Sequence, residues 1–312
     1  MMYNFEKTIS EKILELKNKK NAVILAHYYV TEDLQQIADF VGDSLQLSQE
    51  AAKTNADIIV FVGVNFMAET AKILSPSKKV LLPDLEAGCS LADSCPTKEF
   101  TEFINKYPDY TVISYVNTTA EIKAVSDIIV TSSNAKQIVE KLPKEEKIIF
   151  GPDKNLGSYI NSITGREMVL WNGLCHVHKR FDLDKILKLK KEHPDAKVIA
   201  HPECEKPILI ISDFVGSTAA MLKFTQNDDS QKYIVVTETG ILFKMRLASP
   251  EKIFIPAPPT DENCSCNDCS YMKLNTLQKL YDCLLSEKPE IILSEDLILK
   301  ARKSLDKMLK MS

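Results

Sequence analysis

The chain has 312 residues, of which 45% are hydrophobic and 26% are charged, and this composition excludes a disordered or fibrous protein. Its 39 Lys and Arg residues against 43 Asp and Glu residues give a formal net charge of −4, so we expect no nucleic-acid or membrane partner. No apolar run approaches the roughly 18 residues that span a bilayer, and the first 20 residues lack the apolar centre of a signal peptide. We therefore expect a cytoplasmic protein.

The N-terminal residues 1–20 have the spacing of an amphipathic helix, with Ile9, Ile13 and Leu16 on one side. After them, short apolar strands alternate with helical patterns, which is typical of parallel sheets with helices on their faces. The nine glycines include neither the dinucleotide-binding spacing G-x-G-x-x-G nor a P-loop. The pattern predicts an α/β protein without either of these nucleotide-binding motifs.

A repeat of roughly 85 residues runs through the chain. Three apolar strands end in polar residues at equivalent positions, in residues 21–29, 110–117 and 196–203. A hydroxyl follows at one fixed distance from each strand end, and the three hydroxyls belong to Ser44, Ser132 and Thr218. We therefore expect three similar parallel-sheet α/β units around a pseudo-threefold axis, with a central active site at the strand ends.

The repeat also predicts where the units begin and end. The expected segments are an N-terminal helix (1–20), unit 1 (21–105), unit 2 (106–181), unit 3 (182–270) and two C-terminal helices (271–312) that pack on unit 1.

The cysteines follow the same repeat. Cys89 and Cys175 come just after the last strand of the first two units, and Cys264, Cys266 and Cys269 follow that of the third. Three thiolates at one centre suit an iron–sulfur cluster with one iron left open for substrate, a Lewis acid. The alternative for any single position is a buried structural cysteine.

Polar side chains at the strand ends are the other candidates for chemistry. They are His27, Tyr29, Tyr115, Asn117, His201 and Glu203. His, Tyr and Glu transfer protons, and Asn orients carboxylates or carbonyls. The nearby His176 and His178 either share this work or are solvated. Ser44, Ser132 and Thr218 are expected to cap helices, to bind anions at helix N-termini, or both.

Together these residues resemble the quinolinate synthase family, the A protein of de novo NAD synthesis. The resemblance covers nearly the whole chain and implies three α/β domains arranged as a triangle around a central site. The matching motifs are LAHYY (25–29), IADFVGDSL (37–45), GVNFMAETAKIL (63–74), LPDLEAGCSLAD (82–93), SYVNTTAEIKAVSD (114–127), TSSNA (131–135), GPDKNLGSY (151–159), WNGLCHVH (171–178), AHPEC (200–204), DFVGST (213–218), TETG (237–240) and CNDCSYMKLNTLQKLY (266–281).

The resemblance implies a 4Fe–4S cluster held by Cys89, Cys175 and Cys269, with one iron open. It implies the condensation of iminoaspartate with dihydroxyacetone phosphate to quinolinate, phosphate and two waters, and a possible handoff of iminoaspartate from an aspartate-oxidising enzyme. The family's pocket residues correspond to His27, Tyr29, Ser44, Tyr115, Asn117, Ser132, His201, Glu203 and Thr218.

Within that pocket, we expect Glu203 to act as general base, and His27, Tyr29 and His201 to move protons and contact carboxylates. Some members of the family carry C-x₂-C-x₂-C near the C-terminus, where this chain has C-x-C-x₂-C, so a redox role for Cys264 and Cys266 is not expected. The rival interpretations are another iron–sulfur hydro-lyase, a non-catalytic iron–sulfur redox protein with a fourth cysteine ligand, and a zinc-binding structural module.

Overall fold

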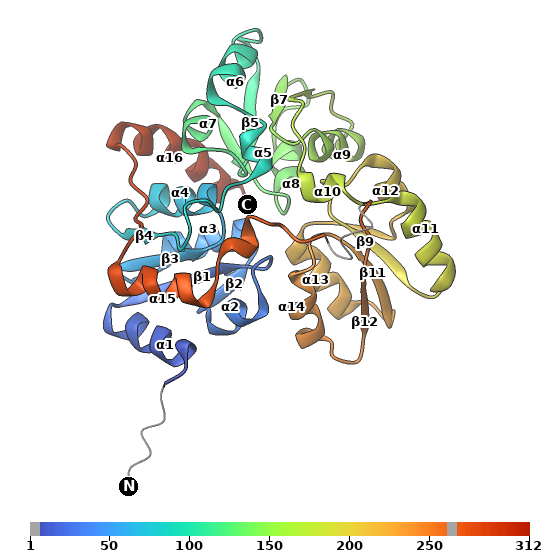
Figure 1. Cartoon of the computed structure of the whole chain (residues 1–312). Coiled ribbons are helices and arrows are strands. Elements are labelled where there is room, and N and C mark those ends of the chain that lie inside the picture. Colours follow the sequence, from blue (N-terminus) through green and yellow to red (C-terminus); the bar gives the residue numbers. More distant parts are fainter. Residues whose placement is uncertain (1–6, 261–266) are drawn as a thin grey trace.

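The computed structural model describes residues 7–260 and 267–312 (Figure 1). Within these residues, twelve strands form three separate four-stranded sheets in which every strand pair is parallel. The strands are β1 (Ala22–His27), β2 (Phe40–Gly42), β3 (Ile58–Val62), β4 (Lys79–Leu81), β5 (Thr111–Tyr115), β6 (Ile128–Val130), β7 (Ile148–Gly151), β8 (Val169–Leu170), β9 (Lys197–Ala200), β10 (Phe214–Val215), β11 (Lys232–Val236) and β12 (Ile253–Pro256).

The three sheets share one strand order, β2-β1-β3-β4, β6-β5-β7-β8 and β10-β9-β11-β12, and we call them, with their helices, the first, second and third units. Figure 1 shows the units at the corners of a triangle, with the C-terminus near its centre. The prediction of three similar parallel α/β units is therefore confirmed.

Helices connect the strands and cover the sheets. They are α1 (Ile9–Lys19), α2 (Glu32–Ile37), α3 (Ser44–Lys53), α4 (Asn65–Leu74), α5 (Ser90–Asp93), α6 (Thr97–Ile104), α7 (Ala120–Val125), α8 (Ala135–Lys141), α9 (Lys154–Thr164), α10 (His176–Lys179), α11 (Leu183–Glu192), α12 (Lys206–Ile211), α13 (Thr218–Asn227), α14 (Ile241–Ala248), the 3₁₀ turn η1 (Met272–Leu274), α15 (Leu277–Ser286) and α16 (Glu295–Met311).

One aspartate hydrogen bond recurs in every unit. The carboxylate of Asp39 accepts the backbone N–H of Ile24 at 2.8 Å. In the second unit, Asp127 accepts the N–H of Val112 at 2.9 Å, and in the third, Asp213 accepts that of Val198 at 2.7 Å. The acceptor lies fifteen residues after the donor each time, so the repeat extends to side-chain bonding.

The first edge strand of each unit was not predicted from the sequence. These strands, β2, β6 and β10, have only two or three residues each and end two or three residues before the three hydroxyl positions. A segment this short shows no alternation of polar and apolar residues, so only its pairing with the neighbouring strand defines it.

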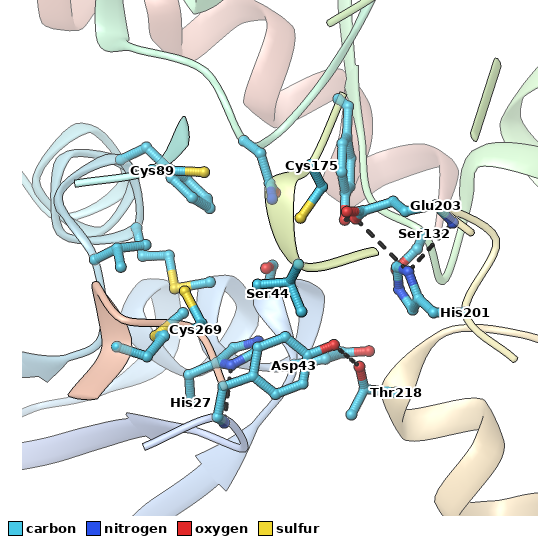
Figure 2. Close-up of a pocket in the computed structure, with 18 of the residues that line it drawn as sticks. His27, Asp43, Ser44, Cys89, Ser132, Cys175, His201, Glu203, Thr218 and Cys269 are labelled. Carbon is cyan, nitrogen blue, oxygen red and sulfur yellow. Dashed lines mark hydrogen bonds and ion pairs between the residues drawn. The ribbon is translucent and has the colours of Figure 1, made fainter. Parts of the chain in front are cut away.

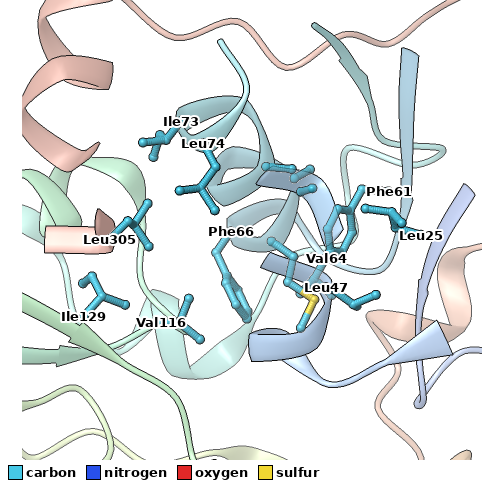
Figure 3. Packing of buried hydrophobic residues seen from close by; sticks show 14 of the residues in the cluster. Leu25, Leu47, Phe61, Val64, Phe66, Ile73, Leu74, Val116, Ile129 and Leu305 are labelled. Carbon is cyan, nitrogen blue, oxygen red and sulfur yellow. The ribbon is translucent and has the colours of Figure 1, made fainter. Parts of the chain in front are cut away.

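The apolar core is shared unequally among the units. One continuous core joins the first unit, the second unit and the two C-terminal helices. Figure 3 shows Phe66 of α4 beside Val116 of the second unit, with Leu305 of α16 near Ile129. The third unit has two cores, one on each face of its sheet.

The C-terminal helices cover the outside of this shared core. α15 packs against α1, and α16 packs against α4 of the first unit and α7 of the second.

The domain boundaries expected from the repeat stay predictions. Among the described residues, we find no helix with the length and apolar character needed to cross a membrane.

Candidate active site

The carboxyl ends of the first strand of each sheet face one pocket, which is lined by residues of all three units (Figure 2). His27 and Tyr115 are the last residues of β1 and β5, and His201 directly follows β9. All twelve residues expected at the site line this pocket: His27, Tyr29, Ser44, Cys89, Tyr115, Asn117, Ser132, Cys175, His201, Glu203, Thr218 and Cys269. Their roles in binding and catalysis stay predictions.

Glu203 is the most heavily contacted group in the pocket. Its side chain is 3% exposed and accepts a hydrogen bond of 2.6 Å from the Tyr115 hydroxyl. His178 Nδ1 lies 3.0 Å from its other carboxylate oxygen. Burial alone would raise the pKa of Glu203, but the nearby His178 and His201 outweigh it and hold that pKa well below its usual range. Glu203 is therefore ionised at neutral pH.

His27 and His201 occupy equivalent places and are bonded in the same way. Nδ1 of each ring accepts the backbone N–H of the residue two positions later, at 3.2 Å for Tyr29 and 3.4 Å for Glu203. This bond assigns the ring proton to Nε2, and Nε2 of His201 lies 3.2 Å from the Ser132 hydroxyl. Burial lowers the pKa of both imidazoles to about 3, so both rings are neutral hydrogen-bond donors at neutral pH.

A hydrogen-bonded path crosses the pocket from the first unit to the third. The Tyr29 hydroxyl lies 2.8 Å from Thr218 Oγ1 and 3.0 Å from Thr237 Oγ1. Thr237 Oγ1 also lies 3.0 Å from His178 Nε2, and His178 continues to Glu203. Burial raises the pKa of Tyr29 well above its ordinary value, so the phenol stays protonated in this path.

The sequence patterns leave two roles open for His178 and do not single out Thr237. His178 is 2% exposed, so its solvated alternative is wrong. Its three-residue spacing from Cys175 is the signal that could have found it, because α10 brings positions i and i+3 to one face. Thr237 directly follows β11, the strand next to β9. The repeat could therefore have predicted that Thr237 lies at a strand end near the site.

None of the three expected helix caps is the observed one. Asp43, not Ser44, caps α3, and Ser217, not Thr218, caps α13. In the second unit, α8 begins after Asn134 instead of after Ser132. The three predicted hydroxyls are therefore not the capping residues and face the pocket instead.

The residues beside these hydroxyls tie the three units together. The Ser133 hydroxyl donates to Asp43 Oδ2 at 2.6 Å and lies 2.7 Å from Ser217 Oγ. Each hydroxyl has one hydrogen, so Ser217 donates to Ser133 when Ser133 donates to Asp43. We call Asp43, Ser133 and Ser217 the interunit tie, because each comes from a different unit.

Asn117 offers an unused acceptor in the pocket. Its Oδ1 is buried, and no described residue hydrogen-bonds to it. An unpaired buried amide oxygen costs folding free energy, so a ligand that donates a hydrogen bond there recovers stability. This atom marks the pocket as a site for a polar ligand.

Three cysteines surround the open part of the pocket and come from two units and the segment before η1. Burial raises the pKa of Cys89 to about 12 and that of Cys269 to about 11, and it raises the pKa of Cys175 well above its ordinary value. Cys89 is close enough to both others for like charges to repel. Three thiolates therefore need a cation among them, which is what a metal centre supplies.

The other described cysteines lie elsewhere. Cys95 is buried in an apolar core with Phe100, as expected for a residue that misses the centre. Cys204 and Cys283 are also buried, and neither lines the pocket. Cys264 and Cys266 lie outside the described residues.

Cys269 is held by a carboxylate of the third unit. Glu238 accepts the backbone N–H of Cys269 at 3.2 Å and pairs with Lys273 at 2.8 Å. Lys273 also donates to the backbone carbonyl of Tyr29 at 2.8 Å. These contacts fix the segment that carries Cys269 against the first and third units.

Comparison with known proteins decides the family. The family model described as "Quinolinate synthetase A protein" matches residues 11–310. The chain belongs to the quinolinate synthase family. Curated quinolinate synthases align over nearly the full length of both partners: the one from Chloroherpeton thalassium is 58% identical over 302 residues (97% of this chain, 94% of that protein), and the one from Thermosynechococcus vestitus is 58% identical over 300 residues (96% and 94%).

A third quinolinate synthase, from a Nostoc species, is 59% identical over 300 residues, which is 96% of this chain and 92% of that protein. Membership of the quinolinate synthase family makes the chain an enzyme and places it in NAD biosynthesis. The family resemblance stated from the sequence motifs is therefore confirmed.

Proposed function

We propose that the chain condenses iminoaspartate with dihydroxyacetone phosphate to form quinolinate, phosphate and two waters, in the cytoplasm. The observation that carries this proposal is the convergence of the strand ends of three repeated units on one pocket lined by neutral donors, hydroxyls and the ionised Glu203. Iminoaspartate is unstable in water by its imine chemistry, and we propose that an aspartate-oxidising enzyme hands it over transiently.

The thiol groups fit a 4Fe–4S cluster with Cys89, Cys175 and Cys269 as ligands. All three are free, partly buried and line the same pocket, and Cys204, the described alternative for a fourth ligand, is outside it. When bound, such a cluster supplies one open iron as a Lewis acid for substrate oxygen and nitrogen. Three ligands favour this open cluster over the fully ligated cluster of an electron carrier.

Substrate anions are bound by uncharged donors. Ser44 and Thr218 are the first residues of α3 and α13, where free backbone N–H groups and the helix dipole favour negative charge. The neutral His201 presents its Nε2 proton beside Ser132. We assign the carboxylate and phosphate oxygens of the substrates to these groups and to Asn117.

Proton transfer is assigned to Glu203 and the path that leads from it. Glu203 removes a substrate proton in enolisation or dehydration, because it is ionised and lies at the pocket wall. His178 and Thr237 connect Glu203 to the Tyr29 phenol, which holds a proton to return. His27 packs edge-on against the Tyr29 ring at 4.4 Å between centroids and orients it.

The test is an anaerobic assay for quinolinate from the two proposed substrates. Cys89→Ser, Cys175→Ser and Cys269→Ser should each lose bound iron and activity together. The matched control is Cys95→Ser, a buried cysteine outside the pocket, which should keep both. Full iron content in Cys269→Ser would contradict the ligand assignment.

A second variant separates the base from the cluster. Glu203→Gln keeps size but removes the proton acceptor, so it should lower turnover by roughly 10²–10⁴ while iron content stays normal. Normal turnover in Glu203→Gln would show that another group takes the proton.

A further inference from the structure

We propose that Cys175, His178 and Glu203 form a site for a single divalent cation of the Zn²⁺ type, filled when the chain carries no iron–sulfur cluster. This site is distinct from the three-cysteine site in two of its three ligands and shares only Cys175 with it. The proposal rests on the residues of the apo chain and does not depend on which reaction the enzyme catalyses.

The three ligand atoms are already gathered. Cys175 Sγ lies 3.3 Å from His178 Nδ1, and His178 Nδ1 lies 3.0 Å from Glu203 Oε2. One sulfur, one imidazole nitrogen and one carboxylate oxygen all lie within 4.8 Å of one another. The first two separations are close to the edges of a tetrahedron around one ion with metal–ligand bonds of about 2.0–2.3 Å, so small side-chain shifts would bring the three atoms onto one ion.

The local fold explains why these atoms converge. Cys175 precedes α10 and His178 lies three residues later, so one helical turn presents both side chains on the same side. Glu203 follows β9 in the third unit and reaches the same point from the opposite wall, as Figure 2 shows for Cys175 and Glu203. The site therefore needs the second and third units in place.

His178 and Glu203 each make a second hydrogen bond, on the side away from the proposed ion. His178 uses Nε2 for Thr237 at 3.0 Å, which leaves Nδ1 for a metal. Glu203 uses Oε1 for the Tyr115 hydroxyl at 2.6 Å, which leaves Oε2. Metal-binding histidines and carboxylates in proteins have this second set of partners, because it fixes the orientation of the ligand atoms.

The donor set selects the kind of ion. A thiolate, an imidazole and a carboxylate are ligands for Zn²⁺ and for Co²⁺, whereas Ca²⁺ and Mg²⁺ prefer oxygen alone. Binding converts the Cys175 thiol to a thiolate and releases its proton to solvent, so a dication meets two negative charges. The three ligands line the pocket, so a fourth position faces the substrate cavity.

Occupancy of this site has a direct consequence for the enzyme. Cys175 cannot bind the ion and a cluster iron in the same way at once, and a metal-bound Glu203 is no longer free to take a proton. A divalent ion at this position therefore excludes the cluster and blocks the proposed base together. The site makes the apo chain a target for zinc before the cluster is built.

The experiment is an anaerobic titration of the full-length apo chain with Co²⁺, followed by displacement with Zn²⁺. We expect the visible absorption of four-coordinate Co²⁺ together with a single thiolate-to-cobalt charge-transfer band, and its loss when Zn²⁺ is added. His178→Gln and Glu203→Gln should weaken Co²⁺ binding on the order of 100-fold or more.

Matched controls use the neighbouring residues. His176→Gln changes a histidine on the same short helix that contacts Ser90 instead of Glu203, and Cys89→Ser changes a cysteine of the proposed cluster only. Both should bind Co²⁺ within about threefold of the unsubstituted chain, while Cys175→Ser should lose the charge-transfer band. A Co²⁺ spectrum that survives His178→Gln, or that disappears in Cys89→Ser, overturns the site.

If His178→Gln fails to fold, a substitution of Thr237, the hydrogen-bond partner of His178, still tests the proposal. Thr237→Val removes the hydrogen bonds of Thr237 to His178 Nε2 and to the Tyr29 hydroxyl, of which only the first holds a proposed ligand, and it should weaken Co²⁺ binding by about 10–100-fold. Unchanged affinity in a folded Thr237→Val chain would count against the proposal. No substrate is present in these titrations, so their outcome is independent of the quinolinate assay.

Discussion

The contact between the first and second units is a continuous apolar core, whereas the third unit meets them through polar groups and a smaller apolar contact around Tyr28 of the first unit. The shared core of the first two units continues through α4, α7 and α16 without interruption. The third unit has two separate cores, one of which takes in Tyr28 of the first unit. It is also joined by hydrogen bonds, such as Gln35 to the Gly240 carbonyl at 3.0 Å and Asn155 to the Glu203 carbonyl at 2.9 Å. The first two units thus form one platform, and the pocket lies where the third unit docks on it.

The two kinds of contact should contribute differently to stability and to substrate binding. Burial of apolar side chains contributes the larger free energy, so the platform should determine the global stability of the chain. Polar contacts contribute less free energy but depend strongly on geometry, so the contacts of the third unit should determine substrate binding.

The largest effect is expected in the platform. Leu305 of α16 is fully buried in the shared core, so Leu305→Ala should lower the free energy of unfolding by about 2–5 kcal/mol. Urea unfolding followed by circular dichroism measures this loss. On the same helix Leu299 is 68% exposed, and Leu299→Ala should change stability by less than about 0.5 kcal/mol. Equal losses in the two variants would contradict a continuous core under α16.

The second effect concerns a buried charge between the first two units. Burial lowers the pKa of Lys123 to about 8, although Glu69 and Glu121 oppose this shift. Its ordinary value is 10.5, so between about pH 8 and 10.5 the unfolded chain binds more protons than the folded one. The free energy of unfolding should therefore increase as the pH rises from about 8 to 10.5, and this gain should be absent below about pH 8.

Urea unfolding of Lys123→Met at several pH values tests this sign. The difference in stability between the unsubstituted chain and this variant should change by on the order of 1–3 kcal/mol between pH 8 and 10.5. Lys300→Met removes an exposed lysine that pairs only with Asp296 of its own helix, and its pH profile should follow the unsubstituted chain. A pH-independent difference for Lys123→Met would mean that Lys123 stays charged throughout.

The third effect separates the third unit from the platform. A Cβ added to Gly240 would lie 2.6 Å from the Tyr28 carbonyl oxygen and 2.8 Å from Tyr29 Cα. Both are backbone atoms, so relieving the clash requires a shift of the main chain, which costs folding free energy. Gly240→Ala should therefore cost about 1–3 kcal/mol and raise the KM for substrate, because the pocket walls no longer meet.

Gly165→Ala is the control for stability alone. Gly165 has a φ of +68° and open space around it, so an alanine there is strained by about 1–2 kcal/mol without touching the third unit. This variant should lose stability and keep the KM of the unsubstituted enzyme. A raised KM in both variants would show that stability, not docking, controls binding.

The smallest effect is expected at the interunit tie. Ser133→Ala removes the hydroxyl that joins Asp43 to Ser217 and should cost about 1 kcal/mol in stability. Its KM should rise, because the neighbouring Ser132 faces the pocket. Ser162→Ala removes an exposed hydroxyl that bonds within its own helix, and should change neither quantity. A double-mutant cycle with Ser217→Ala should show that the two serines are coupled.

The strand ends were predictable because topology determines them. His27, Tyr115 and His201 end strands that repeat in the sequence, and parallel strands in similar units bring their carboxyl ends to one side. The strand order and the short strands beside β1, β5 and β9 were not predictable, because they depend on pairing with residues far along the chain.

The helix starts were the least predictable feature near the site. Asp43 and Ser44 are both good capping residues, as are Ser217 and Thr218, so residue type alone cannot choose between neighbours. The structure chooses the earlier residue in both pairs, and Gln46 completes a capping box with Asp43. His178 was undecided for a similar reason, since its partners Glu203 and Thr237 come from another unit.

Each residue of the interunit tie is the sequence neighbour of a hydroxyl residue that lines the pocket. Asp43 precedes Ser44, Ser133 follows Ser132, and Ser217 precedes Thr218, so one peptide group joins each residue of the tie to a hydroxyl that lines the pocket. A ligand that restrains one member of each pair restrains the other. A change that stiffens the joint between the units beforehand lowers the ordering cost of binding and should tighten it. Slower amide exchange at the three joints should then report substrate occupancy.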